Sequence, residues 1–250
     1  MKKICFIFVL AIVCFSIAQA KGKKILFIGD SITDGNWGGG GAKPSAERNQ
    51  WDMNHIYGSG FMYISAAYYQ GRYSQDEYEF FNRGISGNTL QDLKARWDSD
   101  VIQMHPDVLS VLIGTNDIDF YLKSDKSVQF NFVAWETLYR KLLAEALQSN
   151  PNLKIILCSP FVAKTGRLKT SIDFDERNSL ILHCAHIVQE IAKDYNAIYL
   201  PFDKIIANLL KKSPTSKDTY WIWDGIHPTP AAHERLAELW ISKTKKILKP

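Results

Sequence analysis

The fold is decided by a short stretch, KKILFIGDSITDG at residues 23–35, in which an apolar run stops at a glycine, an acid and a serine. Residues 25–28, after Lys24, are apolar with β-branched or bulky side chains, which predicts a short buried strand over 24–28. Gly29 allows the chain to turn at the end of that strand. Ser31 therefore lies just beyond the carboxyl end of a strand. At this position it could be a nucleophile, a helix cap or an ordinary turn residue.

The same kind of apolar run recurs along the chain and predicts four more strands, at 78–82, 108–113, 154–158 and 197–200. Longer stretches with helical periodicity alternate with these strands, and the clearest are 56–70, 89–104, 132–148, 178–195 and 230–248. Such an alternation predicts an α/β fold in which helices cover both faces of a parallel sheet. Because no linker, repeat or low-complexity tract interrupts the pattern, we expect a single domain over residues 21–250.

The first twenty residues have the pattern of a secretory signal peptide. Lys2 and Lys3 precede an apolar segment at 4–17, and the AQA of residues 18–20 is typical of a cleavage site. The apolar segment is short for a helix that spans a bilayer. We therefore expect an exported protein, periplasmic or extracellular, with no integral membrane segment after cleavage.

Composition argues against some partners of the mature chain. Removal of residues 1–20 leaves 230 residues and takes the formal net charge from +4 to +2. A nearly neutral chain lacks the dense basic face that a phosphate backbone requires, so nucleic acid is not an expected partner.

Of the cysteines, only Cys158 and Cys184 remain after cleavage, both in apolar runs, where we expect free buried thiols. A bond between them stays open at this point, as does the oligomeric state.

Three polar segments follow directly on predicted strands and should therefore meet at one edge of the sheet. Ser31 follows the first strand, NRGISGNT (82–89) the second and GTND (114–117) the third. In a doubly wound sheet, ligands bind beyond the carboxyl ends of the strands. These segments are the candidate site.

A serine nucleophile needs a base within hydrogen-bond reach, held in the right tautomer by a carboxylate. The segment WIWDGIHPTP (221–230) supplies Asp224 and His227, close enough for the carboxylate to fold back onto the ring. Oxyanion donors are available from the backbone at Gly87 and from the side-chain amide of Asn116. Each segment taken alone is also explained as an ordinary turn.

Taken together, GDSITDG, NRGISGNT, GTND and DGIHP resemble the four blocks of the GDSL, or SGNH, hydrolase family of serine esterases, in the same order. The resemblance implies that Ser31 is the nucleophile, His227 the base and Asp224 the supporting acid. It also implies an oxyanion hole formed by the backbone N–H groups of Ser31 and Gly87 and the side-chain amide of Asn116. Water activated by His227 would then release the acyl group.

The family pattern extends to the fold and to cofactors. It implies a three-layer α/β/α sandwich, flavodoxin-like, on a five-stranded parallel sheet, and a reaction without metal or organic cofactor. Gly87 rather than Gly84 matches the glycine whose N–H group the family uses as an oxyanion donor, and Ile32 stands where the family name has leucine.

His183 and His186 lie three residues apart and are a metal-binding alternative without an evident third ligand.

Tryptophans near the motifs bear on the substrate. Trp37, Trp51, Trp221 and Trp223 lie close in sequence to the nucleophile or the base, and aromatic rings beside a polar site make platforms for sugar rings. With Trp37 and Trp223 as candidate substrate-binding residues, we predict cleavage of a short acyl group, acetyl above all, from a glycan or small-molecule ester. The alternatives are a lysophospholipase or short-chain lipid esterase of the same family, and a non-catalytic carbohydrate-binding protein on the hydrolase fold.

Overall fold

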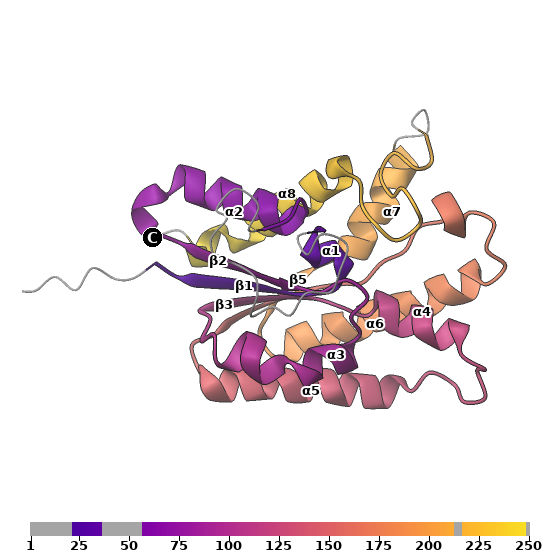
Figure 1. Ribbon diagram of the computed structural model, residues 1–250, viewed down its shortest axis with the longest axis horizontal. Coiled ribbons are helices and arrows are strands. Elements are labelled where there is room, and N and C mark those ends of the chain that lie inside the picture. Colours follow the sequence, from indigo (N-terminus) through magenta and orange to yellow (C-terminus); the bar gives the residue numbers. More distant parts are fainter. Residues whose placement is uncertain (1–21, 37–56, 213–216, 249–250) are drawn as a thin grey trace, which may run out of the picture.

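Five parallel strands form one sheet in the computed structural model, which describes residues 22–36, 57–212 and 217–248. The strand order is β2-β1-β3-β4-β5 (Figure 1). The bounds are β1 Lys24–Gly29, β2 Glu79–Gly84, β3 Val108–Leu112, β4 Lys154–Cys158 and β5 Ile198–Leu200. This is the flavodoxin-like order, in which the connections diverge between β1 and β3 and leave a ligand crevice there. The predicted five-stranded parallel sheet is confirmed.

Helices cover both faces of the sheet, so the predicted α/β/α layering is also confirmed (Figure 1). One face carries α1 (Ser31–Asp34), α2 (Phe61–Arg72), α7 (Phe202–Lys212) and α8 (Pro230–Leu248). The other carries α3 (Leu90–Ala95), α4 (Thr115–Lys123), α5 (Phe132–Ser149) and α6 (Phe174–Asp194). Short 3-10 turns occupy Ser74–Asp76 and Gly166–Leu168, and a π-helical turn occupies Asp98–Ile102.

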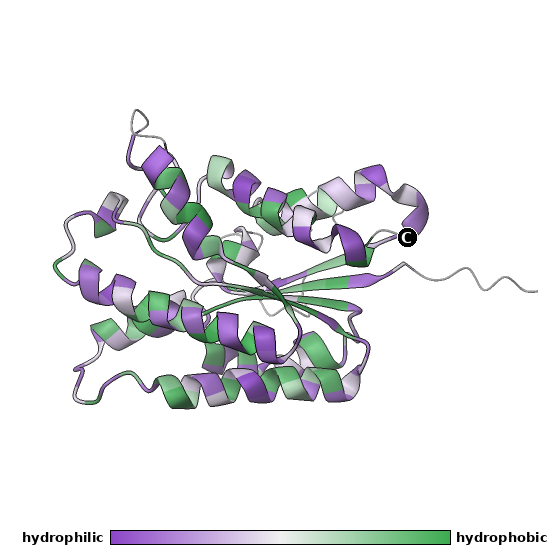
Figure 2. Cartoon of the chain, turned by 180° about the vertical axis from the view of Figure 1, so that it is seen from behind, coloured by the Kyte–Doolittle hydropathy of each residue, from purple (hydrophilic) through white to green (hydrophobic). Residues whose placement is uncertain are grey.

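The alternation of side chains along β1 explains the two hydrophobic cores. Ile25 and Phe27 face the α2/α8 layer, whereas Leu26 and Ile28 face the α3/α5/α6 layer, and all four side chains are buried. Trp240 of α8 packs on Phe27 with ring centroids 4.8 Å apart. Figure 2 shows the apolar strands between helices whose polar residues lie largely on the outer surface. A strand that is buried on both faces has a continuous apolar run in its sequence, and β1 shows this pattern.

Three helices escaped prediction, the one-turn α1 as well as α4 and α7, and the helices predicted over 56–70 and 89–104 are shorter. The sequence of α4 opens with GTND, which favours a turn, yet Ile118 and Leu122 are buried against the sheet. The strongly amphipathic α7 was also missed. The helix predicted over 89–104 divides into α3 and the π-helical turn, and a capping box between Thr89 and Asp92 begins α3.

The two remaining cysteines lie in different cores. Cys158 packs on the α2/α8 side of the sheet and Cys184 on the other side, and both are free and buried. Because the sheet separates them, they do not form a disulfide.

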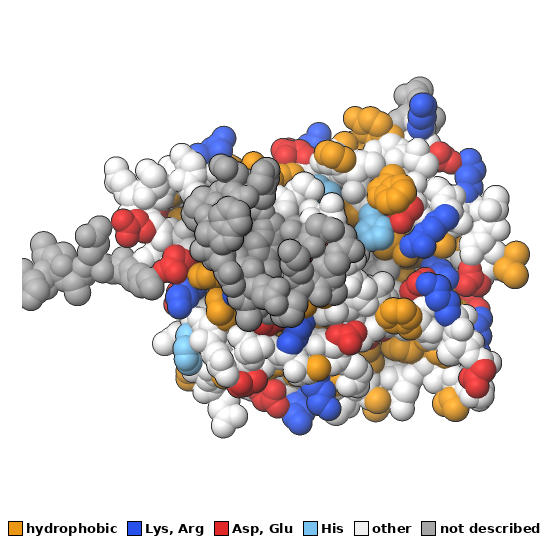
Figure 3. Space-filling view, in the orientation of Figure 1, with side chains coloured by type: hydrophobic (Ala, Val, Ile, Leu, Met, Phe, Trp, Pro, Cys, Tyr) orange, Lys and Arg blue, Asp and Glu red, His pale blue; other side chains and the backbone are white. Residues whose placement is uncertain are grey.

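The predicted signal peptide lies outside the described residues. Within the described ranges, no helix has both the length and the apolar character needed to cross a membrane. On the face shown in Figure 3, basic and acidic side chains are interspersed.

Candidate active site

Ser31 is the first residue of α1, directly beyond the carboxyl end of β1. Asp30 caps this helix, because its carboxylate accepts a hydrogen bond from the N–H of Ile32 at 3.0 Å. The helix ends after one turn at Gly35, whose N–H donates to the carbonyl oxygen of Ser31. This tight turn holds the Ser31 side chain, which is half-buried, at the crevice of the sheet.

The structure brings His227 from the far end of the sequence onto Ser31. The Oγ of Ser31 lies 2.8 Å from Nε2 of His227, and Nδ1 of His227 lies 2.8 Å from Oδ2 of Asp224. The other carboxylate oxygen of Asp224 accepts the backbone N–H groups of Ile226 at 2.9 Å and His227 at 2.8 Å. The loop therefore folds back on itself as its sequence predicts, and His227 is placed to accept a proton from Ser31.

The surroundings of Asp224 keep its carboxyl group negatively charged beside the His227 ring. Burial raises the pKa of this carboxyl group, but the hydrogen bonds from the His227 ring and from two backbone N–H groups outweigh burial and hold the pKa at about 2. Asp224 is thus ionised at neutral pH. Sequence reasoning missed Arg167, whose Nε lies 3.6 Å from Oδ2 of Asp224. Arg167 is about sixty residues away in sequence, and no local signal marks it.

Gly84 and Gly87 have different surroundings. Gly84 ends β2, and a Cβ atom there would lie 2.3 Å from the backbone nitrogen of Asp34, so this glycine allows α1 to pack against the strand. Gly87 has φ +84°, and a Cβ atom there would meet nothing within 4 Å. Among the described residues, the N–H groups of Ser31 and Gly87 have no hydrogen-bond acceptor. Both donors are available to a ligand.

Asn116 lies in the first turn of α4, at the end of β3. Its side-chain amide donates to the carbonyl oxygen of Asn88 at 3.1 Å, next to Gly87. One amide hydrogen is engaged by this bond, which leaves the second hydrogen for another acceptor. The sequence-predicted donors from β1, β2 and β3 therefore meet at one edge of the sheet.

Arg96 ties these strand ends together and was not singled out from the sequence. Its guanidinium donates to the carbonyl oxygens of Arg83 at 2.7 Å and Gly29 at 3.2 Å, and to the side-chain oxygen of Asn88 at 2.9 Å. An ion pair with Asp100 at 2.6 Å holds the guanidinium in place. Arg96 thus fixes the loop that carries Gly87 relative to the end of β1.

Two buried acids lie beside the predicted site residues. Burial raises the pKa of Asp30 to about 7 and that of Asp117 to about 6, although each carboxylate accepts backbone hydrogen bonds that lower it. Asp117 accepts from the N–H of Leu90 at 3.0 Å and from the indole of Trp135 at 3.0 Å. Asp30 thus caps α1, whereas Asp117 joins the start of α4 to α3 and α5.

A pocket of about 350 Å³ opens beside Ser31 and His227. The residues lining it are Ser31, Asp34, Gly35, Asn36, Ser59, Ser86, Trp223, His227, Pro228, Pro230 and His233. Trp223 is 57% exposed, and its ring lies 6.2 Å from that of His227 at 28° between the planes. Trp221 instead packs against the core. Trp37 and Trp51 lie outside the described residues.

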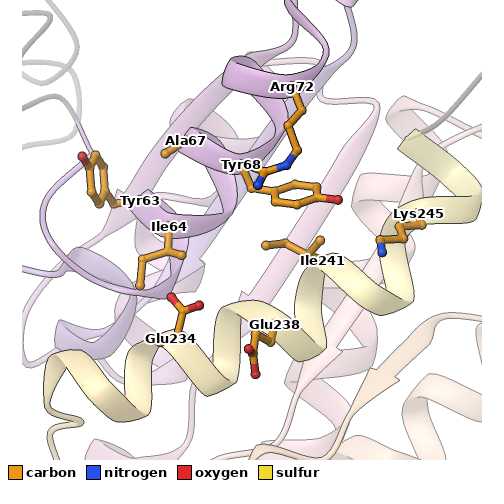
Figure 4. A pocket seen from close by; sticks show the side chains of 9 residues that line it. All are labelled: Tyr63, Ile64, Ala67, Tyr68, Arg72, Glu234, Glu238, Ile241 and Lys245. Atoms are coloured by element: carbon orange, nitrogen blue, oxygen red, sulfur yellow. The ribbon is translucent and has the colours of Figure 1, made fainter.

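The larger groove of about 570 Å³ lies elsewhere, between α2 and α8. Figure 4 shows Tyr63, Tyr68 and Arg72 from α2 opposite Glu234 and Glu238 from α8. The residues that line this groove include no serine, cysteine or histidine. The candidate catalytic groups Ser31 and His227 line the smaller pocket instead.

The histidines considered as a metal site have another environment. The ring of His183 stacks on Phe132, with ring centroids 4.0 Å apart. Over the ranges that the structure describes, no cluster of three or more His, Cys, Asp or Glu residues has the arrangement of a metal site.

Comparison with known proteins places these features in a family. The model of the GDSL-like lipase/acylhydrolase family matches residues 27–235. An acetylxylan esterase from Geobacillus stearothermophilus is 32% identical over 225 residues, which cover 88% of this chain and 93% of the relative.

Solved structures agree with the sequence comparison. A protein from Parabacteroides merdae described as a GDSL-like lipase superposes with a TM-score of 0.76 at 29% identity, covering 90% of this chain and 96% of that one. The crystal structure of an acetylxylan esterase from Geobacillus stearothermophilus gives a TM-score of 0.71 at 31% identity, covering 89% and 94% of the two chains. This chain therefore belongs to the GDSL-like lipase/acylhydrolase family and is a carboxylic ester hydrolase.

Proposed function

We propose that this protein removes acetyl groups from a carbohydrate, with Ser31, His227 and Asp224 as its catalytic triad. The observation that carries the proposal is the pair of 2.8 Å contacts that joins Ser31 Oγ to His227 Nε2 and His227 Nδ1 to Asp224. The acetylxylan esterase among the relatives supports the choice of acetyl group and sugar.

Acylation begins at Ser31. Its Oγ attacks the carbonyl carbon of the ester while Nε2 of His227 takes the hydroxyl proton. Asp224 holds the proton of Nδ1 and stabilises the imidazolium that forms, because its pKa of about 2 keeps it ionised. His227 then passes the proton to the leaving sugar oxygen, and the acetyl group remains on Ser31.

The negative charge that develops on the carbonyl oxygen needs donors. The N–H groups of Ser31 and Gly87 and the amide of Asn116 supply them, and loss of one such donor typically costs about 10² to 10³ in rate. A water molecule then gives a proton to His227 and attacks the carbonyl carbon of the acetyl group, and His227 returns that proton to Oγ of Ser31 as acetate leaves. The chain's own residues provide every proton transfer in this sequence of steps.

The surroundings favour a sugar as the alcohol part of the ester. The exposed ring of Trp223 beside His227 offers a flat apolar face, to which the apolar face of a sugar ring packs well. Export, which residues 1–20 predict, would bring the enzyme to acetylated polysaccharides outside the cytoplasm.

The nucleophile is tested by Ser31→Ala, with Ser179→Ala on the exposed surface of α6 as the matched control. With p-nitrophenyl acetate, Ser31→Ala should lose at least about 10³ in kcat. Ser179→Ala should keep the wild-type rate. A Ser31→Ala protein that folds and retains a tenth of the wild-type kcat would disprove the assignment.

The substrate is tested by acetate release from a panel of acetylated glycans, with lysophospholipids as the competing class. Acetyl, butyryl and octanoyl esters of p-nitrophenol add the chain-length preference. We expect turnover of acetylated glycans and the highest kcat/KM for acetyl. Preference for octanoyl and for lysophospholipids would favour the lipid esterase, and glycan binding without turnover of any ester would favour the binding protein.

A further inference from the structure

A second histidine lines the pocket of Ser31 and His227, and the mechanism does not use it. His233 lies in the first turn of α8, and its side chain is largely buried, with 9% of its surface exposed. It follows His227 by six residues, on the helix that begins just after the catalytic loop. Its ring stacks over Phe61 at 6.5 Å between centroids.

The hydrogen bond of His233 fixes its tautomer. Nδ1 accepts the backbone N–H of Phe61, the first residue of α2, at 3.1 Å. A ring nitrogen that accepts a hydrogen bond carries no proton, so the neutral ring holds its single proton on Nε2. Burial, and the repulsion from His227 whenever that ring is protonated, lower the pKa of His233 to about 4. At neutral pH the ring is therefore an uncharged donor with a defined direction.

The Nε2–H group is free to bind a ligand. Nε2 has no hydrogen-bond partner among the described residues, and it is not one of the solvent-excluded polar atoms. It is therefore reached from the pocket that His233 lines together with Ser31 and Trp223. A neutral N–H donor suits a neutral hydroxyl oxygen, because neither partner brings a net charge that would have to be desolvated.

We propose that Nε2–H of His233 donates a hydrogen bond to a free hydroxyl of the sugar ring and so sets the preference of the enzyme for carbohydrate esters. This inference rests on the proposed carbohydrate substrate. The two ring nitrogens of His233 then have separate roles. Nδ1 holds the start of α2, and Nε2 binds the substrate. Trp223 contributes the apolar face of the same subsite, and His233 contributes its polar contact.

Two substitutions separate these duties. In His233→Asn, the side-chain oxygen can take the place of Nδ1 and accept the Phe61 N–H, but nothing replaces Nε2. In His233→Gln, the amide nitrogen can reach the place of Nε2, but the acceptor for Phe61 is lost. The readout is the ratio of kcat/KM for a monoacetylated xylo-oligosaccharide, which has free hydroxyls, to kcat/KM for p-nitrophenyl acetate, which has none.

We expect His233→Asn to lower this ratio about tenfold, mainly through KM for the oligosaccharide, while the midpoint of thermal unfolding stays near that of the wild type. His233→Gln should restore most of the ratio and unfold at a lower temperature. A merely structural histidine would give the same order of unfolding temperatures but a wild-type ratio in His233→Asn, because Asn keeps the acceptor for the Phe61 N–H group.

The two possible failures differ. If wild-type protein cleaves the oligosaccharide and His233→Asn keeps the wild-type ratio, the role of His233 is refuted and the proposed function stands. If wild-type protein cleaves p-nitrophenyl acetate and no acetylated sugar, the proposed carbohydrate function is refuted and this inference falls with it.

Discussion

Replacement of Asp224 by asparagine should leave the fold intact and remove almost all activity. The reason lies in how the two carboxylate oxygens are used. Oδ1 accepts two backbone N–H groups, from Ile226 and His227, while Oδ2 faces Nδ1 of the His227 ring. An asparagine at this position has one oxygen and one NH₂ group, so only one of the two arrangements can survive.

The structure decides which arrangement survives. If the NH₂ group faced the backbone, two buried N–H donors would lose their acceptor, at a cost of about 2–6 kcal/mol for the pair. The oxygen therefore stays on the backbone, and the NH₂ group must face Nδ1 of His227. His227 then becomes an acceptor at Nδ1 and carries its proton on Nε2, towards Ser31. In that tautomer it cannot take the proton of Ser31.

The expected loss is about 10⁴ in kcat, the size found when a triad histidine is held in the wrong tautomer. The assay is hydrolysis of p-nitrophenyl acetate at neutral pH, with thermal unfolding to show that the variant folds. Asp218→Asn is the matched control, because Asp218 is exposed at the start of the same C-terminal segment and pairs only with Lys169 within the described residues. A folded Asp224→Asn protein within tenfold of the wild-type kcat would show that Asp224 does not set the tautomer.

Three further predictions follow from the site and its supports. Asn116→Ala should lower kcat about 10² to 10³-fold with little change in KM, and a loss of less than threefold would exclude the amide as an oxyanion donor. Burial raises the pKa of Asp30 from 3.8 to about 7, so the stability that this group contributes falls by about 4 kcal/mol as pH rises from about 4 to 7. Asp30→Asn should flatten that part of the pH profile of the unfolding free energy, and an unchanged urea-denaturation profile would refute the assignment. Gly84→Ala should destabilise the fold by about 1–3 kcal/mol, because its Cβ would press on the backbone nitrogen of Asp34, whereas Gly71→Ala in open space on α2 should not destabilise it in the same thermal melts.

Local patterns predicted the parts of this fold that depend on neighbours in sequence. The apolar runs located all five strands, and the helical periodicity located the starts of α3 and α8 to within a residue. Asp224 and His227 were predictable as a pair because three residues of loop suffice to bring their side chains together. The helix α4 was missed because its polar opening, GTND, favours a turn, while its burial depends on contact with distant elements.

The sequence by itself thus determined the α/β class, the parallel sheet and the segments that supply Ser31, Gly87, Asn116 and His227. Only the tertiary structure decided how these groups meet and what supports them. Arg96 bridges the ends of two strands, and His233 holds α2 with one ring nitrogen while its other nitrogen is open to the pocket. The physical reason is that periodicity and turn chemistry act within a few residues, whereas a hydrogen bond between side chains and backbone far apart in sequence exists only after the sheet has assembled.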